Sequence, residues 1–358
     1  MAAYVLRRLG VAVCLLFVLS VITFLMYSQI PANPAGFVID LQHASRAQIA
    51  EVDHELGVDR PIWVQYEKFV VRALHGDLGL SWNGIQFSYL GTASGVPVGP
   101  LVWHAAKVTA SVVVGGFVLL LAIALPLGAF VATRPRGAAD RLSLGLSLAA
   151  ISTHPLVVGL LLQLFAGNRW HLAPPSGYCP LVPPSAAAKA EAARQGSELC
   201  GGPLAWASHL VLPWITFALF FVALYLRMTR ARMMEVLDEP YVRTARAKGG
   251  SELRVVVRHA LRNAISPIVT MVGMDAGMAV GIAVYVETVF ALPGLGRTTI
   301  QALQGFSGYD LPVIVGVVLV TAVAIILLNL LVDLALYAID PTIARRGRKA
   351  LASAARAA

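Results

Sequence analysis

The sequence predicts an all-α integral membrane protein with six transmembrane helices. Of its 358 residues, 58% are hydrophobic and only 13% are charged, and the mean hydropathy is +0.73. Several continuous apolar runs have about the 20 residues that a helix needs to cross a hydrocarbon core roughly 30 Å thick. They are too long and too uniformly apolar for barrel strands. The candidate spans lie at about 9–30, 109–133, 142–166, 209–228, 267–290 and 312–338.

The first run forms the N-terminal segment, residues 1–30. Arg7 and Arg8 precede it, as basic residues precede a signal peptide. Its apolar stretch from Val11 to Ile30 is longer than the 7–15 residues of a typical signal core. We therefore expect a retained membrane helix, with a cleaved signal peptide as the alternative.

Residues 31–108 are expected to form a structured segment on the outer side. Ala44–Leu56 and Pro61–Leu74 both show the apolar spacing of amphipathic helices. Gly57 and Gly76 follow these stretches and indicate where the helices end.

The remaining five spans form a core domain over residues 109–338, with a second outer loop before the fourth span. Cys179 and Cys200 both fall in this loop, and a disulfide between them is plausible in an oxidising compartment. Two unpaired thiols remain the alternative. Cys14 lies in the first span as a small apolar residue, and no metal-ligand spacing involves the cysteines.

The net charge of +9 follows the topology of a membrane protein. If the N-terminus, the loops 134–141 and 227–262 and the C-terminal tail 339–358 share one side, that side holds 19 of the 28 Lys and Arg. This is the positive-inside pattern, with both termini cytoplasmic and the basic tail near the lipid surface. The charge therefore needs no nucleic-acid partner.

A basic cytoplasmic loop, residues 229–266, separates the fourth and fifth spans. Asp238–Glu239–Pro240 is a good helix start, Gly249–Gly250 should end that helix, and Ser251 can cap a second one. Val242, Ala245 and Gly249 then share a small, smooth face. This face would suit docking into a groove of another protein, whereas attraction of the loop to anionic lipid is the alternative.

The chain shows no catalytic motif of its own. A Walker A sequence requires a lysine after a glycine, and none of the five lysines follows one. If transport against a gradient is driven by ATP, a partner must hydrolyse it.

Several segments, in order along the chain, resemble ABC importer permeases of the dipeptide/oligopeptide/nickel group. The basic loop carries the group's coupling segment "YVRTARAKG" (241–249) followed by "RHALRNA" (258–264). Further similar segments are "LRRL" (6–9), "ITFL" (22–25), "LGVDRPIWVQY" (56–66), "HGDLGLS" (75–81), "MTRARMMEVL" (228–237), "VETVFALPGLG" (286–296), "YDLPVIVGVVL" (309–319) and "DPTIARR" (340–346).

This resemblance implies a type I ABC importer transmembrane domain in the bacterial cytoplasmic (inner) membrane, importing di- or oligopeptides. The implied partners are a second homologous permease, two ATPase subunits or domains, and an extracytoplasmic substrate-binding protein. ATP and Mg²⁺ would be bound in the ATPase subunits, and this chain would bind no cofactor. The implied ATPase-coupling residues are Tyr241, Val242, Arg243, Thr244, Ala245, Arg246, Ala247, Lys248 and Gly249.

Two departures from the group's pattern stand out. One is an insertion at about 179–205, which carries both outer cysteines. The other is Asp275 in the middle of the fifth span, where an ionised carboxylate costs about 2.5–3.5 kcal/mol on insertion scales and should face a cavity or a partner. Asp275 could bind a substrate's ammonium group, or be protonated or paired at the contact with the second permease.

The other candidate residues of the translocation path are weaker. Gly273, Gly277 and Gly281 recur every four residues around Asp275, a spacing that allows close helix packing. His154, beside Pro155, and Glu287, at the outer end of the fifth span, fit structural roles better than roles in transport.

Other functions remain to be weighed. Similar permeases handle nickel, haem or glutathione, so the cargo is open. An ion-coupled secondary transporter is disfavoured because buried charges are few and no inverted repeat is evident. An intramembrane hydrolase is disfavoured because no second carboxylate or hydrolase motif accompanies His154 or Asp275.

Overall fold

The computed structural model describes most of the chain as helices. The described residues are 2–29, 45, 48, 54, 60–81, 86–87, 93–94, 96–135, 137–138, 140–141, 145, 153–185, 200–304 and 309–339. The chain divides into two compact units, Met1–Val108 with Gly294–Ile326, and Thr109–Pro293 with Leu327–Ala358. The two are described separately below.

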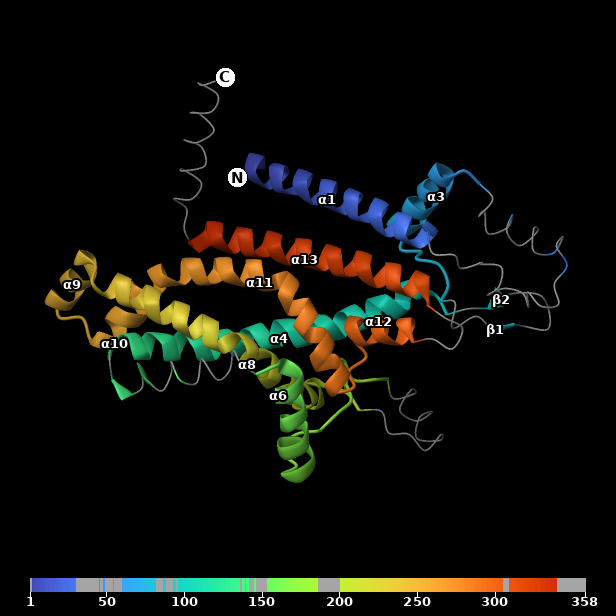
Figure 1. Cartoon of the computed structure of the whole chain (residues 1–358). Helices are drawn as coiled ribbons and strands as arrows, with labels where there is room; N and C mark the ends of the chain where they lie inside the picture. Colours follow the sequence, from blue (N-terminus) through green and yellow to red (C-terminus); the bar gives the residue numbers. More distant parts are fainter. Residues whose placement is uncertain are drawn as a thin grey trace, which may run out of the picture. The chain divides into compact units, whose positions relative to one another are not determined.

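In the first unit, helix α1 (Ala2–Gln29) packs against α3 (Ile62–Leu74) (Figure 1). The ring of Tyr66 lies against Phe24, with 5.3 Å between ring centroids, and its hydroxyl is 2.8 Å from Ser20 Oγ. Two short strands of two residues each, β1 (Gln86–Phe87) and β2 (Ala93–Ser94), follow along the chain and pair antiparallel. Helix α3 confirms the amphipathic helix predicted for this part of the outer segment.

The core of the first unit lies between three helix segments. These are the start of α4 (Val98–Ala132), α12 (Leu295–Leu303) and the start of α13 (Leu311–Ile339). Buried Asp310 precedes α13, where its carboxylate accepts a 2.5 Å hydrogen bond from Ser81 and a 3.4 Å bond from the backbone N–H of Val313. The buried side chains that share this core are Val98, Val102, Ala105, Leu295, Ala302, Val313 and Val317.

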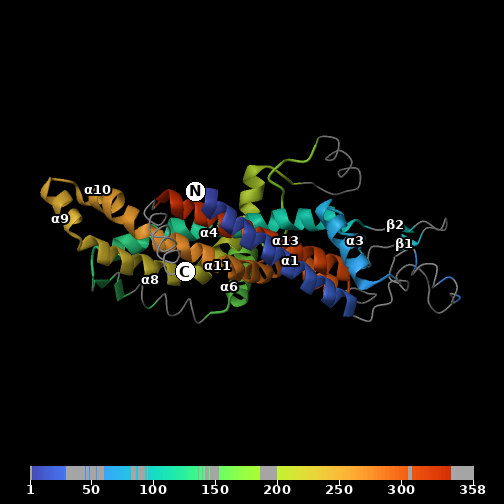
Figure 2. The ribbon, with the colours of Figure 1, turned by 90° about the horizontal axis from the view of Figure 1, so that it is seen from above.

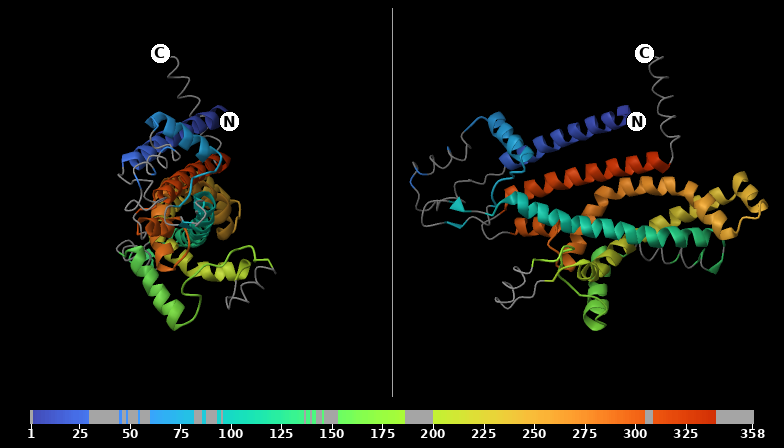
Figure 3. Two further views of the ribbon diagram at one scale, coloured as in Figure 1. Left: turned by 90° about the vertical axis from the view of Figure 1, so that its right-hand side faces the viewer. Right: turned by 180° about the vertical axis from the view of Figure 1, so that it is seen from behind.

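The second unit is built on two long helices that pack together. They are α8 (Pro203–Leu237) and a helix that begins at Glu252, comprising α10 (Glu252–Arg254), a π-helical stretch Val255–Leu261 and α11 (Arg262–Val289). The short helix α9 (Pro240–Ala247) joins them at one end, as Figures 1 and 2 show. Helix α6 (Pro155–Leu162), followed by a π-helical turn Gln163–Arg169, contacts both α8 and α11 and runs across them (Figure 3).

Glycines allow α4 and α8 to approach closely. A side chain at Gly115 would collide with the ring of Trp214, and one at Gly116 would collide with Phe217. The Trp214 indole N–H then reaches α4, where it donates a 2.9 Å hydrogen bond to the carbonyl of Ser111. Small residues at helix contacts are typical of membrane proteins, where van der Waals packing and hydrogen bonds hold the helices together.

Four helices are long and apolar enough to cross a membrane: Val98–Ala132, Pro203–Leu237, Glu252–Val289 and Leu311–Leu336. Two shorter apolar helices, Gly10–Leu25 and Pro155–Arg169, fall within the first and third predicted spans. The all-helical membrane fold is therefore confirmed in outline, and each of the six predicted spans contains at least part of an apolar helix.

The third span does not form the single helix predicted over 142–166. His154 has an extended backbone (φ −70°, ψ 139°), and α6 begins only at Pro155. A residue before proline favours an extended backbone, because in the helical conformation the proline ring collides with its N–H and Cβ, and His154 adopts that extended backbone. The preference is not absolute, since Pro126, Pro213 and Pro267 lie inside helices. Most of 142–152 lies outside the described residues.

Three further predictions fall largely outside the described part of the chain. Only three residues of the helix expected at 44–56 are described. The middle of the insertion, 186–199, and the basic tail from 340 onward are not among the described residues.

Candidate functional site

Helix α9 is bounded by the residues that the sequence indicated. Glu239 is extended, Pro240 takes the first helical position, and the helix ends before Lys248. Gly249 then has φ +80°, a left-handed conformation that favours glycine, and the N–H of Gly250 bonds to the carbonyl of Ala245. The predicted short helix and glycine turn are confirmed. Ser251 precedes α10 as predicted, but its side chain makes no capping hydrogen bond.

Two of the three residues of the predicted docking face, Val242 and Ala245, are turned into the protein, whereas Gly249 is exposed, so a partner cannot reach Val242 and can reach Ala245 only in part. Val242 is fully buried and Ala245 is partly buried against the same apolar cluster. Because the cluster shields these side chains from water, they hold α9 against its own subunit. The other buried members come from α4, α8 and the helix that begins at Glu252: Ala129, Ala132, Met233, Leu237, Val255, Val256, Ala260 and Ala264.

The opposite face of α9 is exposed. Successive helical residues are rotated by about 100°, which places Arg243, Thr244 and Ala247 on the side away from Val242. All three side chains are exposed, as is Lys248 at the helix end. This outward face combines positive charge with a small residue at its centre, and we refer to Arg243, Thr244 and Ala247 as the outward face of α9.

Two polar contacts fix the flanks of α9. The side-chain amide of Asn263, on α11, donates a 2.7 Å hydrogen bond to the hydroxyl of Tyr241. Arg246 donates to both carboxylate oxygens of Glu252, at 2.7 and 3.1 Å. That hydrogen-bonded pairing lowers the pKa of Glu252 and raises the pKa of Arg246.

A largely buried ion pair ties the helical residues 140–141, which follow α4 along the chain, to α8. Asp140 is buried and accepts a 2.8 Å hydrogen bond from Nη2 of Arg230, which is partly exposed. Removing one partner of such a pair leaves an uncompensated charge, so the contact restrains both elements.

Asp275 has a hydrogen-bond partner inside the chain. The hydroxyl of Tyr225, a fully buried residue of α8, donates a 2.9 Å hydrogen bond to its carboxylate, and Asp275 itself is partly buried. The sequence suggested either a substrate or the second permease as partner and missed Tyr225. No local signal reveals it, because the two residues are fifty positions apart and meet only when α8 packs on α11.

The glycines around Asp275 occupy different environments. A side chain added at Gly273 would lie 2.9 Å from Cγ1 of Val332 on α13, whereas Gly277 and Gly281 face open space. The expected close packing therefore holds for Gly273 and is wrong for the other two within this chain. Four residues make an exposed stripe on α11: Met274 (73% exposed), Gly277, Met278 (55% exposed) and Gly281. Their four-residue spacing could have revealed the stripe.

His154 and Glu287 have structural contacts. His154 accepts a 3.2 Å hydrogen bond from the N–H of Leu156 as the cap of α6, and its ring meets Tyr285 on α11 edge-on, 4.8 Å between centroids. Glu287 is fully buried, and its carboxylate accepts a 2.5 Å hydrogen bond from Thr109 on α4.

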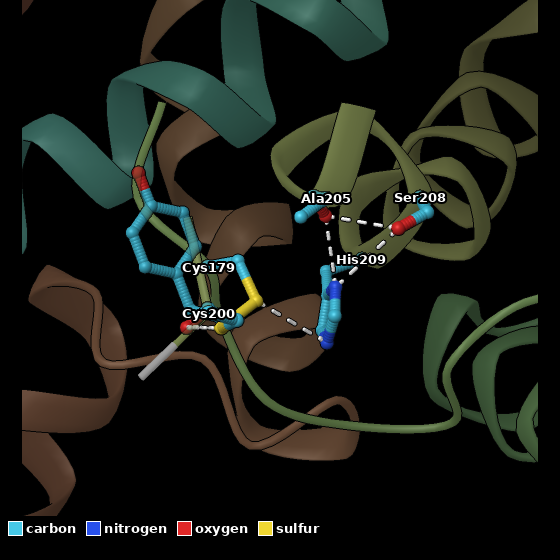
Figure 4. Close-up of a disulfide and its surroundings, with 6 residues drawn as sticks. Cys179, Cys200, Ala205, Ser208 and His209 are labelled. Carbon is cyan, nitrogen blue, oxygen red and sulfur yellow. Dashed lines mark hydrogen bonds between the residues drawn. A yellow bond between two sulfur atoms is a disulfide. The ribbon is translucent and has the colours of Figure 1, made fainter. Parts of the chain in front are cut away.

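The two outer cysteines form a disulfide, Cys179–Cys200, with 5.4 Å between Cα atoms. It joins the loop after the π-helical turn to the residues before α8. Figure 4 shows His209 of α8 beside it, a neighbour that the sequence analysis did not single out.

Sequence comparisons with known proteins match most of the chain. Residues 124–345 match the family described as "Binding-protein-dependent transport system inner membrane component", and residues 1–93 match the N-terminal part of such membrane components. The chain is 34% identical over 350 residues to the dipeptide transport system permease protein DppB of Escherichia coli (strain K12), covering 96% of this chain and 99% of that protein.

Two further relatives cover the same extent. A probable peptide ABC transporter permease of Sinorhizobium fredii is 32% identical, and a putative peptide transport system permease of Brucella abortus is 30% identical, each over 343 residues covering 96% of this chain and 99% of the relative. The apolar helices, their order and the matches along the chain agree with one conclusion. The chain belongs to the family of binding-protein-dependent transport system inner membrane components.

Proposed function

We propose that this chain is one of two transmembrane subunits of an ATP-driven importer that takes up dipeptides or oligopeptides. The membership of the family supports the transport role, and the relatives named as dipeptide and peptide permeases support the cargo. Two ATPase subunits bind and hydrolyse ATP with Mg²⁺, and an extracytoplasmic binding protein delivers the peptide. For transport, this chain supplies no catalytic group and binds no cofactor.

In this proposal the chain crosses the membrane six times. The four long apolar helices supply four crossings, and the helices at Gly10–Leu25 and Pro155–Arg169 belong to the other two. The distribution of Lys and Arg puts both termini and α9 on the cytoplasmic side.

Helix α9 is the coupling helix, and the orientation of its two faces is the observation that carries the proposal. Val242 and Ala245 hold α9 on the ends of α4, α8 and α11, while the outward face of Arg243, Thr244 and Ala247 meets the ATPase subunit. Because α9 is packed on the ends of membrane helices and tied to α11 by Tyr241 and Asn263, a displacement by the ATPase is passed to those helices.

The exposed stripe of α11 lines the translocation path. Met274 and Met278 offer flexible, polarisable contacts suited to varied peptide side chains, and Gly277 and Gly281 leave room for a peptide backbone. Asp275 points to the side of the helix that meets Tyr225, so we assign it to holding α8 and α11 together instead of binding the peptide.

Reconstitution tests the proposal. The chain is inserted into liposomes with its second permease and its two ATPase subunits, and the binding protein and a labelled dipeptide are added outside. We expect uptake that requires ATP and the binding protein and that stops when the ATPase's Walker A lysine is replaced.

Two results would contradict this function. Uptake driven by a proton gradient with this chain alone would identify a secondary transporter. ATP-dependent uptake of nickel, haem or glutathione, without uptake of any peptide in a panel of lengths two to six, would keep the mechanism and remove the peptide cargo.

A further inference from the structure

The surroundings of the Cys179–Cys200 disulfide gather three side chains that bind soft metal ions. Sγ of Cys179 lies 3.6 Å from Nε2 of His209, and one ligand atom of each of the three residues lies within 4.8 Å of the other two (Figure 4). Cys179 is buried, His209 is partly buried and Cys200 is exposed. The group therefore has an enclosed side and an open side.

The hydrogen bond of His209 settles which of its ring nitrogens can bind a metal. Nδ1 lies 2.8 Å from the carbonyl oxygen of Ala205, one helical turn earlier on α8. A carbonyl oxygen only accepts hydrogen bonds, so Nδ1 carries the hydrogen in the neutral ring. Nε2 then carries the lone pair, and it is the nitrogen that lies beside Cys179. A histidine that binds zinc is typically held in this way, with its other ring nitrogen donating to a backbone carbonyl or a carboxylate.

We propose that the reduced form of this cluster is a metal site, in which the thiolates of Cys179 and Cys200 and Nε2 of His209 bind one soft divalent cation of the zinc type. Zinc binds cysteine sulfur at about 2.3 Å and histidine nitrogen at about 2.0–2.1 Å. Tetrahedral bonds of these lengths place the ligand atoms about 3.3–3.8 Å apart, a separation that the cluster reaches by small side-chain rotations once the sulfurs part. The exposed side next to Cys200 leaves the fourth position to a water molecule.

The chemistry makes the disulfide and the metal mutually exclusive. A dithiol reductant gives two electrons and two protons to the disulfide, breaks the S–S bond and becomes a cyclic disulfide itself. The two thiols formed then lose their protons as the cation binds. In either state Cys179 stays linked to Cys200 and the ends of the insertion are held together, by a covalent bond in one case and by the cation in the other.

This inference goes beyond the proposed transport function and does not depend on it, because the ligands all belong to this chain. Metal binding can therefore be measured on the purified full-length chain in detergent, with no transport assay. Cobalt(II) is the probe, since it replaces zinc and gives a thiolate charge-transfer absorption when it is bound by cysteine.

The experiment compares the same chain in two redox states. After reduction with a dithiol and its anaerobic removal, we expect one Co²⁺ per chain with a thiolate absorption band, displaced by Zn²⁺. The oxidised chain should show neither, and re-oxidation with a disulfide oxidant should release the ion. If the reduced chain binds no Co²⁺, or the oxidised chain binds it with the same spectrum, the proposal is overturned.

Variants identify the ligands. Cys200→Ser should weaken the absorption band, because it removes one of the two thiolate ligands, and His209→Ala should weaken Co²⁺ binding at least tenfold. His75→Ala is the matched control, because Nδ1 of His75 also lies close to the carbonyl four residues earlier, 2.7 Å from Val71. Cys14→Ser controls for the exposed cysteine of α1. Unchanged binding by the His209 variant would remove the histidine from the site and contradict the proposal.

Discussion

The side-chain amide of Asn263 donates a 2.7 Å hydrogen bond to the hydroxyl of Tyr241. These two residues belong to two separate motifs of the basic loop, "YVRTARAKG" and "RHALRNA", and the bond joins them. It connects the start of α9 directly to the start of α11, which carries the exposed stripe. In the proposed function, this bond passes movement of α9 to α11.

Removing this bond should weaken the transmission. Tyr241→Phe deletes the hydroxyl and keeps the ring, and a single hydrogen bond contributes about 0.5–1.5 kcal/mol. We expect the purified subunit to unfold within a few degrees of the wild-type temperature, while dipeptide uptake per ATP hydrolysed falls several-fold. Tyr309→Phe, at another exposed tyrosine, serves as the control and should leave the ratio unchanged. An unchanged ratio for Tyr241→Phe would show that the bond transmits nothing.

The buried face of α9 should matter for stability. Val242→Ala removes two buried methyl groups, and with the cavity left behind it should lower the free energy of unfolding by about 2 kcal/mol. Arg243→Ala, one residue along on the exposed side, should change it by no more than about 0.5 kcal/mol. Denaturant unfolding of the detergent-purified chain measures both. Equal effects of the two substitutions would mean that α9 is not packed as described.

Substitutions at the two kinds of glycine in α11 should have different effects: one should impair folding and the other should impair transport. Gly273→Leu forces a side chain against Val332, so we expect lower yield and a lower unfolding temperature. A Cβ added at Gly277 would meet no atom within 4 Å, so Gly277→Leu should leave yield unchanged, but it should reduce peptide uptake by filling the translocation path. Wild-type uptake in a well-folded Gly277→Leu subunit would argue against the stripe as part of that path.

Asp275→Asn tests the role of the Tyr225 contact. Asparagine can still accept the tyrosine hydrogen bond without a charge, so we expect neutral and cationic dipeptides to be taken up at unchanged relative rates. Asp275→Leu, which cannot accept, should lower the unfolding temperature because it leaves the buried hydroxyl unpaired. A loss of cationic dipeptide uptake alone in Asp275→Asn would instead show that the carboxylate binds the substrate's ammonium group.

The ion pair of Arg246 and Glu252 should contribute little to the free energy of unfolding. Both side chains are exposed, and such pairs contribute about 0–1 kcal/mol. Since pairing lowers the pKa of Glu252, the contribution is present at neutral pH and is lost as the pH falls through that lowered pKa. The Glu252→Gln variant should therefore differ from wild type slightly at neutral pH and not at all in strong acid. A stability difference that persists unchanged in acid would assign it to a cause other than the charge pair.

Local patterns in the sequence predicted the features that short-range physics controls. Apolar runs of about twenty residues located the membrane helices. Glu239–Pro240 and Gly249 marked the ends of α9, because proline fixes φ at the first helical position and glycine readily adopts the left-handed conformation that ends a helix. Helix α6 begins at Pro155, but Pro126, Pro213 and Pro267 lie inside continuous helices, so a proline alone does not mark such a break.

Contacts between distant segments could not be read in this way. The face of Val242, Ala245 and Gly249 is predicted to meet a partner because the sequence does not show the cluster from α4 and α8 that covers Val242 and part of Ala245. The pairing of Asp275 with Tyr225 and the position of His209 beside Cys179 likewise arise only when helices pack. The periodic spacing of residues shows which side chains share one face of a helix, but it does not show which other helix packs against that face.

The ratio of dipeptide uptake to ATP hydrolysis tests the central claim most directly, measured in proteoliposomes that contain the complete transporter with the Ala247→Leu variant. Ala247 lies on the outward face of α9 and makes no part of the buried cluster. The account predicts a folded, assembled complex that still hydrolyses ATP but whose uptake per ATP falls about 5–150-fold, the range that corresponds to a coupling free energy of about 1–3 kcal/mol. A wild-type ratio in that variant would contradict the assignment of α9 as the coupling helix.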